Sequence, residues 1–152
     1  MPTSKNAYRL HIGRYSEPGR LYLLTTITQN RRPFFSDFKT GRLVVDQFRL
    51  AHDEGIVRSK AWVVMPDHFH WLIELQGKTL GEVMCRVKSR SSLSINKHAN
   101  ASTRIWQKGY HDRAVRQEED VKDIARYIVK KPIRAGLATR IGDYPLWDAC
   151  WI

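Results

Sequence analysis

The chain has 152 residues, a length that favours one domain with its own hydrophobic core. Hydrophobic residues make up 42% of it, yet no apolar run approaches the roughly 20 residues of a membrane-spanning helix, so we expect no membrane partner. Lys and Arg total 26 against 15 Asp and Glu, and this net charge of +11 favours nucleic acid as a partner, with a merely soluble basic protein as the alternative.

The N-terminal sequence, MPTSKNAYRL, has no hydrophobic signal core, and we therefore expect a cytoplasmic protein. The two cysteines, Cys85 and Cys150, are far apart and lack CxxC spacing, which favours reduced thiols and argues against a thiolate zinc site. No internal repeat or linker is visible. We therefore expect residues 1–152 to form a single domain, with residues 140–152 as a C-terminal tail packed on it.

Secondary structure is predicted from the spacing of apolar residues along the chain. Runs rich in β-branched and aromatic residues predict strands, whereas apolar residues three and four apart predict amphipathic helices. The predicted elements, in chain order, are a strand at 19–30, a helix at 40–55, strands at 56–65 and 68–75, a helix at 79–99, a strand at 104–116 and a helix at 118–132.

This order of elements predicts an α+β fold. The first six elements match the split β-α-β plan of a ferredoxin-like or RRM-like domain, in which two helices cover one face of an antiparallel sheet. The opposite face is then available for a site or for a nucleic acid. A C-terminal helix that carries Tyr127 follows the sixth element. Because one fold hosts many functions, the function has to be argued from particular residues.

The segment MPDHFHWLIEL places two histidines one residue apart at the start of the predicted strand 68–75. Because side chains alternate along a strand, His68 and His70 share one face of the sheet while Phe69 points to the other. Neutral imidazoles at this spacing can bind a divalent metal. The motif alone is weak, and histidines that are exposed or hydrogen-bonded without a metal are the alternative.

Tyr127 lies at the border between the packed face of its helix and solvent, about 110° from the centre of the apolar stripe at ~100° per residue. A boundary tyrosine commonly packs its ring and keeps its hydroxyl in water. A phenol beside a metal and positive charge is also a competent nucleophile. The residues alone leave both interpretations open.

Candidate DNA contacts lie on the basic helix predicted at 79–99. Arg86 and Arg90 are one turn apart on this helix, and Lys88 lies between them. Such cations can bind DNA phosphates. A solvated basic helix face, without a DNA contact, is the alternative.

Aromatic residues near the end of the chain suggest further contacts. Trp106 and Tyr110 could stack on unpaired bases. Tyr110 and His111 could also be a nucleophile and a ligand in a different arrangement, although a tyrosine and a histidine at a sheet edge are the simpler interpretation. Trp147 and Trp151 are expected to dock the tail onto the body of the domain rather than to bind DNA.

Several of these motifs together resemble the REP-associated tyrosine transposases, a branch of the single-tyrosine HUH transposases, in which HUH denotes His-hydrophobic-His. The resemblance rests on VVMPDHFHWLIEL, on IWQKGYHDRAVRQEEDVKDIARYIVKKPIRAGLA after a basic helix, on the closing DYPLWDACWI and on the N-terminal TTITQNRRPFF. It runs from about residue 12 to the C-terminus, with the order and spacing of the motifs kept.

The resemblance implies an enzyme that cleaves and rejoins single-stranded DNA at hairpins such as REP elements, which are repetitive extragenic palindromes of bacterial genomes. His68 and His70 would hold Mg²⁺ or Mn²⁺ against the scissile phosphate, and Tyr127 would attack phosphorus. The products would be a 5′-phosphotyrosine linkage and a free 3′-hydroxyl, without a nucleotide cofactor. Related transposases are dimers and this branch is regarded as monomeric, so a monomer or a homodimer is expected.

The chain departs from the family pattern just after the tyrosine. Family members typically carry an Asn four residues beyond it as a third metal ligand, and the matching residue here is Lys131. The i, i+4 relation keeps Lys131 on the same side of the helix as Tyr127, but a charged ammonium cannot ligate a metal. The metal could be held by the two histidines and water, or another group could replace the Asn as the third ligand. Alternatively, metal binding could be weakened. Lys131 could instead contact the phosphate or activate the tyrosine.

Two other functions compete with the transposase interpretation. A non-catalytic hairpin-binding module, inactivated by loss of the Asn, would bind hairpins without forming a covalent product. A metal-dependent nuclease that activates water would cleave DNA with Tyr127 in a purely structural role.

Overall fold

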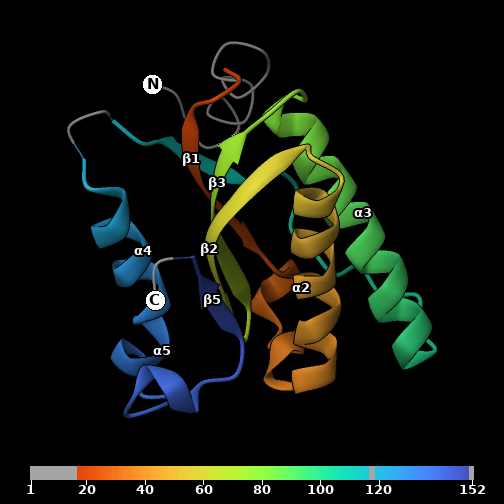
Figure 1. Ribbon diagram of the computed structural model, residues 1–152. Helices are drawn as coiled ribbons and strands as arrows, with labels where there is room; N and C mark the ends of the chain where they lie inside the picture. The colour runs from red at the N-terminus through yellow and green to blue at the C-terminus, as the bar shows by residue number, and fades with distance from the viewer. Residues whose placement is uncertain (1–16, 117–118, 151–152) are drawn as a thin grey trace, which may run out of the picture.

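Five segments pair into one antiparallel sheet in the computed structural model, which describes residues 17–116 and 119–150. The strands are β1 (Leu21–Ile27), β2 (Val57–Met65), β3 (His68–Leu75), β4 (His111–Ala114) and β5 (Trp147–Ala149). Their order in the sheet is β4-β1-β3-β2-β5, so the split β-α-β sheet is extended by β5 at the β2 edge (Figure 1). The α+β fold predicted from the sequence is confirmed.

The helices begin where side chains can accept from free backbone N–H groups. Asp37 accepts from the backbone N–H of Thr40, and Thr79 forms a capping box with Glu82. The helices are α2 (Phe38–Asp53), α3 (Leu80–Ala99), α4 (Val121–Val129) and α5 (Lys131–Arg134), with short 3-10 turns at Gln29–Arg31, Phe34–Ser36 and Ile141–Asp143. In the described parts of the chain, no helix is both long and apolar enough to cross a membrane.

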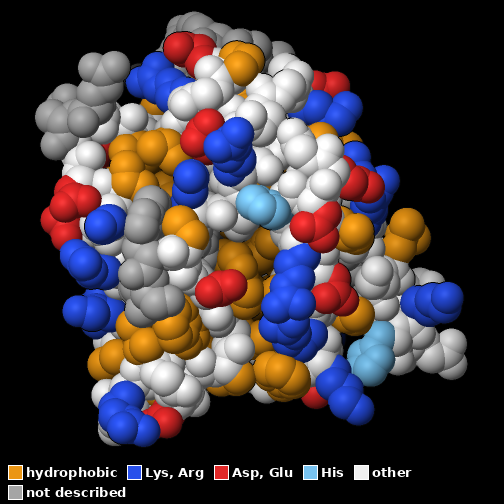
Figure 2. Space-filling view, in the orientation of Figure 1, with side chains coloured by type: hydrophobic (Ala, Val, Ile, Leu, Met, Phe, Trp, Pro, Cys, Tyr) orange, Lys and Arg blue, Asp and Glu red, His pale blue; other side chains and the backbone are white. Residues whose placement is uncertain are grey.

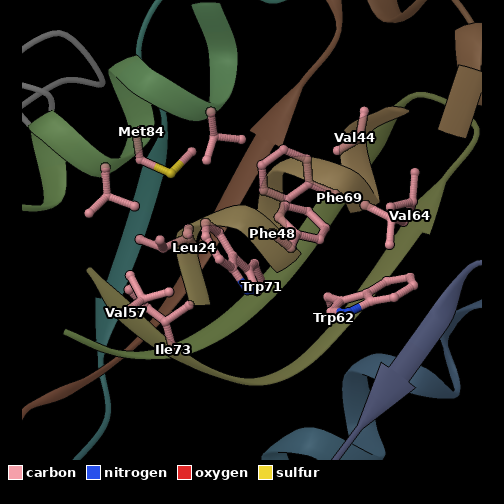
Figure 3. Close-up of a cluster of buried hydrophobic side chains, with 14 of the residues drawn as sticks. Leu24, Val44, Phe48, Val57, Trp62, Val64, Phe69, Trp71, Ile73 and Met84 are labelled. Atoms are coloured by element: carbon pink, nitrogen blue, oxygen red, sulfur yellow. The ribbon is translucent and has the colours of Figure 1, made fainter. Parts of the chain in front are cut away.

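The larger hydrophobic core lies between the sheet and the pair α2 and α3 (Figures 1 and 3). The ring of Phe48 on α2 stacks on Trp71 with centroids 4.5 Å apart, and it meets Phe69 edge-on at 4.9 Å. Trp71 and Phe69 both come from β3, on the face opposite the histidines. This core therefore fixes β3, the strand that carries the candidate ligands.

The second face of the sheet is partly covered, which the sequence analysis did not expect. Ile124, Ala125, Ile128 and Val129 on α4 pack with Leu72 of β3 and with apolar residues of β2 in a second hydrophobic cluster. Figure 1 shows α4 and α5 on one side of the sheet and α2 and α3 on the other. The expectation that this face is open is wrong, because the apolar stripe of α4 needs a surface to bury it.

The strand predicted at 104–116 is shorter than expected. Only His111–Ala114 pairs continuously with β1, while Trp106 makes an isolated bridge to Thr28. Gly109 has a φ of 80°, a left-handed conformation that interrupts an extended strand. The chain therefore follows the edge of β1 twice, with a turn between the two contacts.

The helix predicted at 118–132 ends earlier, at Val129, and is followed by the separate short helix α5. Pro132 lacks an N–H group, and its ring would crowd the carbonyl four residues earlier in a continuous helix. Pro132 is instead tolerated in the first turn of α5. Residues 117 and 118 lie outside the described residues, so the predicted start of this helix is not tested.

The C-terminal segment docks on the sheet and on α2. The Tyr144 hydroxyl donates to the Val64 carbonyl at 2.6 Å, and burial raises the pKa of this phenol to about 12. Leu146 is buried against Gly41, where any added Cβ would overlap it. Trp147 donates from its indole N–H to the Ile141 carbonyl, as expected for a docking residue. Trp151, predicted to dock as well, lies outside the described residues.

Candidate active site

The histidine pair lies at the N-terminal end of β3, on the face that α4 partly covers. Cross-strand partners in the sheet fix this position, because Ile27 of β1 is opposite His68 and Thr25 is opposite His70. The centroids of the two imidazole rings are 5.0 Å apart, at an interplanar angle of 80°. The structure therefore brings His68 and His70 together on one face, as the alternation of side chains in a strand predicts.

His68 is oriented by the residue that precedes it. Its Nδ1 lies 2.7 Å from a carboxylate oxygen of Asp67, and Arg31 donates to the same carboxylate at 3.2 Å. Burial raises the pKa of Asp67, but the His68 hydrogen bond and the Arg31 guanidinium outweigh this and hold the pKa below its usual value. An ionised carboxylate only accepts, so Nδ1 of His68 carries a proton and donates a hydrogen bond to Asp67.

His70 is held by a residue of the neighbouring strand. The Thr25 hydroxyl lies 2.8 Å from His70 Nδ1, and the buried Nε2 has no hydrogen-bond partner among the described residues. Burial lowers the pKa of His70 to about 3, and electrostatic interactions with His68, Lys131 and Arg134 lower it further. His70 is therefore a neutral imidazole at physiological pH, the form that can bind a metal.

Both imidazoles are held through Nδ1, so their Nε2 atoms are the candidate metal ligands. The hydrogen bonds at both Nδ1 atoms match the way in which metal-binding histidines are usually oriented. Within residues 17–116 and 119–150, however, no group of three His, Cys, Asp or Glu side chains is placed to hold a metal. Any metal bound here by His68 and His70 therefore needs further ligands from water or from substrate oxygens.

Tyr127 lies on α4 with its side chain exposed at 56%, as expected for a residue at the border of the packed face. The Lys131 ammonium lies 5.2 Å from the centroid of its ring, and the Arg134 guanidinium carbon lies 4.1 Å from the same centroid. The charges of both cations also act on His70. Tyr127, Lys131, Arg134 and His70 therefore share one neighbourhood, although they come from three elements.

The basic residues predicted as DNA contacts on α3 lie away from this neighbourhood. The helix packs on the opposite face of the sheet from the histidines. Arg86 pairs with Glu54, and Arg90 lies 3.9 Å from the same carboxylate. Lys88 donates to the carbonyls of Gln107 and Gly109 at 2.7 and 2.6 Å. Protein groups thus already engage these cations, and a DNA contact by any of them stays a prediction.

A groove of roughly 340 Å³ separates α3 from the segment 103–109, and its lining includes Lys88 and Trp106. Trp106 is only 4% exposed, and its indole N–H donates to Ser91. The prediction that Trp106 stacks on bases is therefore wrong, because its faces are buried in the core. Tyr110 is half-buried, and base stacking by it stays a prediction.

His111 occupies a place that the sequence analysis weighed as an alternative site. It lies opposite Thr25 in the β1–β4 pair, and Thr25 also lies opposite His70. Directly opposed residues of neighbouring strands point to the same face, so His111 and His70 share a face with Thr25 between them. His111 is exposed, and no metal group including it is found in the described part of the chain.

We expect Lys88 to make stability depend on pH. Burial lowers the pKa of its ammonium from the ordinary 10.5 to about 8, with a smaller contribution from the charge of Arg104. Between these pH values the unfolded chain holds a proton that the folded chain has released, so folding becomes more favourable as pH rises. Urea unfolding of wild type and Lys88→Met at pH 7.5 and 9.5 should show wild type gaining stability relative to the variant.

The exposed Lys97 on the same helix provides the control for this measurement. Lys97→Met should leave the pH dependence of unfolding parallel to that of wild type. Parallel curves for Lys88→Met would contradict the assignment of Lys88 as a cation whose charge is costly in the fold.

Three residues of this neighbourhood were missed as site residues in the sequence analysis. Asp67 was not singled out from the sequence, although its place directly before His68 was a usable signal. Thr25 is the polar position on an otherwise apolar face of β1, and only strand pairing connects it to His70. Arg134 lies seven residues after Tyr127, beyond the proline where the helix was expected to end.

Charged side chains are spread widely over the face of the protein that Figure 2 shows. Figure 2 shows Lys and Arg side chains across the whole visible face, with acidic side chains between them. A net charge of +11 is therefore not gathered into a single patch on this face. Recognition of a polyanion by this protein thus depends on where particular cations are placed.

An antiparallel sheet that carries a histidine pair, beside a helix that presents a tyrosine, defines the class of protein. Residues 20–131 match the family of IS200-like transposases, and the chain belongs to this family of DNA-cleaving and strand-transferring enzymes. Within the family it is similar to the REP-associated tyrosine transposase of Escherichia coli (strain K12), at 24% identity over 142 residues that span 87% of this chain and 78% of that protein.

Another relative is similar over most of the chain, and two solved structures share its fold. A putative REP-associated tyrosine transposase of Haemophilus influenzae (strain ATCC 51907 / DSM 11121 / KW20 / Rd) is 22% identical over 143 residues, covering 84% of this chain and 78% of that protein. A REP-associated tyrosine transposase bound to a REP hairpin has the same fold, with a TM-score of 0.72 at 23% identity over 88% of this chain and 79% of that one. A putative transposase from Deinococcus radiodurans R1 gives a TM-score of 0.56 at 21% identity, covering 76% and 93%.

Proposed function

We propose that this protein cleaves and rejoins single-stranded DNA at hairpin sequences, with Tyr127 as the nucleophile. The observation that carries the proposal is an exposed tyrosine ring flanked by Lys131 and Arg134, whose charges also act on His70. A relative in the family binds a REP hairpin, which supports hairpin DNA as the substrate class. A nucleophile, two cations and a histidine pair at one place suit phosphoryl transfer.

In the proposed reaction the Tyr127 oxygen attacks the phosphorus of a phosphodiester in single-stranded DNA. The new bond joins the tyrosine oxygen to phosphorus, and the bond from phosphorus to the 3′-oxygen breaks. The phenolic proton is released to solvent, and the leaving 3′-oxygen takes up a proton to become a hydroxyl. Attack by a 3′-hydroxyl on the phosphotyrosine reverses these steps and joins strands, so no energy-supplying nucleotide is required.

We propose that His68 and His70 bind Mg²⁺ or Mn²⁺ through their Nε2 atoms, with the other ligands from water and the substrate phosphate. A bound metal would polarise the phosphate and stabilise the charge that develops during attack. Asp67 and Thr25 orient the imidazoles for this role through their Nδ1 atoms. Lys131, in place of the Asn of related proteins, contributes positive charge instead of a ligand.

The test is a search for a covalent protein–DNA product. The protein is incubated with Mn²⁺ and end-labelled single-stranded oligonucleotides that fold as hairpins with unpaired flanks, chosen from palindromes of its own genome. We expect a labelled species that migrates with the protein on a denaturing gel and disappears after protease digestion. A released strand with a free 3′-hydroxyl should accompany it in equal amount.

The two alternative functions predict different products in the same experiment. A water-activating nuclease would give cleaved DNA without a labelled protein. A non-catalytic hairpin-binding module, favoured by the lysine in place of an asparagine ligand, would retard the oligonucleotide on a native gel and leave it intact. Either result with the wild-type protein would overturn Tyr127 as the nucleophile.

Asp67 should control metal affinity at the proposed site. Asp67→Asn removes the negative charge that holds the His68 proton on Nδ1, and residues in this supporting position typically contribute about 10- to 100-fold to metal affinity. We therefore expect Mn²⁺ binding, measured by electron paramagnetic resonance of free Mn²⁺, to weaken by about this factor. Asp123→Asn removes a carboxylate from the exposed surface of α4 and should leave the affinity unchanged. Equal Mn²⁺ affinity of Asp67→Asn and wild type would contradict the role given to Asp67.

A further inference from the structure

The break between α4 and α5 places two cations against the nucleophile. Lys131 and Arg134 both belong to α5, and both side chains return to Tyr127 on α4. Arg134 also donates from its guanidinium to the backbone carbonyl of Tyr127. The carbonyl that this guanidinium contacts lies close to the end of α4, where backbone acceptors lack partners within the helix. The position of Arg134 is therefore specified twice, by a ring contact and by a hydrogen bond.

The contact geometry of Arg134 leaves most of its donors available. A guanidinium has five N–H groups in one plane, and stacking on an aromatic ring uses the face of that plane. One of these N–H groups donates to the Tyr127 carbonyl. No other side-chain hydrogen bond of Arg134 is found among the described residues, and two N–H groups of a guanidinium can donate in parallel to phosphate oxygens. Arg134 is exposed, so these donors are accessible to a substrate.

The charges of these two residues are not balanced by neighbouring acids. Neither Lys131 nor Arg134 forms an ion pair with any carboxylate in the stretches that the structure describes. The carboxylate of Asp67, next to His68 in the sequence, is engaged by His68 and Arg31. Two such cations repel each other unless an anion lies between them. The neighbourhood therefore favours an anion at the Tyr127 side chain.

We propose that Lys131 and Arg134 form a cationic clamp that holds the scissile phosphodiester of single-stranded DNA beside the Tyr127 hydroxyl. This inference rests on the proposed function and assigns Arg134, as well as Lys131, to substrate binding. The clamp neutralises the phosphate with protein cations, so it binds the phosphate without a metal. It thereby takes over, through charge, the positioning that a third protein ligand to a metal would provide.

The test is binding in EDTA, where neither metal nor cleavage is needed. The probe is a hairpin oligonucleotide with an unpaired flank, prepared as a series in which one phosphate after another along the flank is a neutral methylphosphonate. With the wild-type protein, the methylphosphonate at one position should weaken binding by about 10- to 100-fold, the usual effect of losing a charge-assisted contact. All other flank positions should matter much less.

Variants then connect that phosphate to the clamp. Arg134→Met and Lys131→Met should each weaken binding of the unmodified oligonucleotide. In each variant, a methylphosphonate at the same position should then weaken binding much less than it does in the wild type. Arg134→Lys keeps the charge but loses the fork, so it should recover part of the affinity. Arg140→Met, which removes an exposed arginine paired with Asp143, is the matched control and should behave as wild type.

The outcomes separate this proposal from the proposed function. If the wild-type protein does not bind in EDTA, shows no sensitive position, or keeps its sensitivity in Arg134→Met, the clamp is overturned. The clamp is also overturned if Arg134→Met weakens binding by the same factor for the oligonucleotides with a methylphosphonate at each position. General electrostatic attraction between the protein and DNA would give that result. A covalent product without a sensitive phosphate leaves Tyr127 as the nucleophile and removes the clamp. A sensitive phosphate without any covalent product supports the clamp in a protein that only binds DNA.

Discussion

Replacement of Tyr127 by Phe should abolish the covalent protein–DNA product and leave the fold intact. The change removes one oxygen atom, the proposed nucleophile, from a side chain that is 56% exposed. Removal of a nucleophile usually lowers the rate by about three orders of magnitude or more. Removal of an exposed hydroxyl changes the free energy of unfolding by about 0.5 kcal/mol or less. The measurements are the yield of labelled protein on a denaturing gel and the urea unfolding curve.

Tyr110→Phe is the matched control, because Tyr110 is the alternative nucleophile that the sequence suggested. This variant should form the covalent product at close to the wild-type rate. Loss of the product in Tyr110→Phe with retention in Tyr127→Phe would exchange the roles of the two residues. Hairpin binding in EDTA should survive in Tyr127→Phe, since an aromatic ring still supports Lys131 and Arg134.

The second large effect concerns stability, and we expect it for Phe48→Ala. Phe48 is completely buried, stacks on Trp71 and meets Phe69 edge-on. Truncation of a buried Phe typically costs about 3–5 kcal/mol, because transfer free energy is lost and a cavity remains. A domain has only about 5–15 kcal/mol of stability in total. Urea unfolding followed by tryptophan fluorescence should therefore show a midpoint at much lower denaturant concentration.

Leu93→Ala is the control for this stability experiment, since Leu93 is 73% exposed on α3. Its unfolding midpoint should stay close to wild type. A decrease of less than about 1 kcal/mol in the free energy of unfolding of Phe48→Ala would contradict this prediction. It would mean that α2 moves into the cavity and still supports β3. In that case the histidines on the opposite face of β3 would not depend on the aromatic core for their position.

Much of the fold was predictable because local patterns and tertiary contacts agree. The predicted strand 68–75 has the same bounds as β3, since its alternation matches a strand with one face fully buried and the other partly covered. The helix predicted at 79–99 matches α3 within one residue, because a capping box marks its start. By contrast, the strand predicted at 104–116 contains residues that satisfy strand propensity but turn away at Gly109, where the Lys88 ammonium binds backbone carbonyls.

The candidate site was predictable only where it is local in the sequence. Spacing within β3 identified His68 and His70 as one face, and the helical stripe put Tyr127 at a border. The side of the sheet to which α4 packs depends on the connection after β4, which periodicity does not describe. Thr25 reaches His70 through strand register, and Arg134 reaches Tyr127 through a break in a helix. Such contacts depend on chain geometry over many residues.

The short strand β5 has a consequence for how separate molecules behave toward one another. Without it, β2 would be an edge strand nine residues long whose apolar second half, Ala61–Met65, would leave backbone N–H and C=O groups available to another chain; β5 pairs with Ala61, Trp62 and Val63 of this half. Exposed edges of this kind are templates for sheet extension and aggregation. The opposite edge, β4, has only four residues and carries charged side chains. The docked C-terminal segment thus covers the apolar part of the β2 edge, the part on which another chain could otherwise extend the sheet.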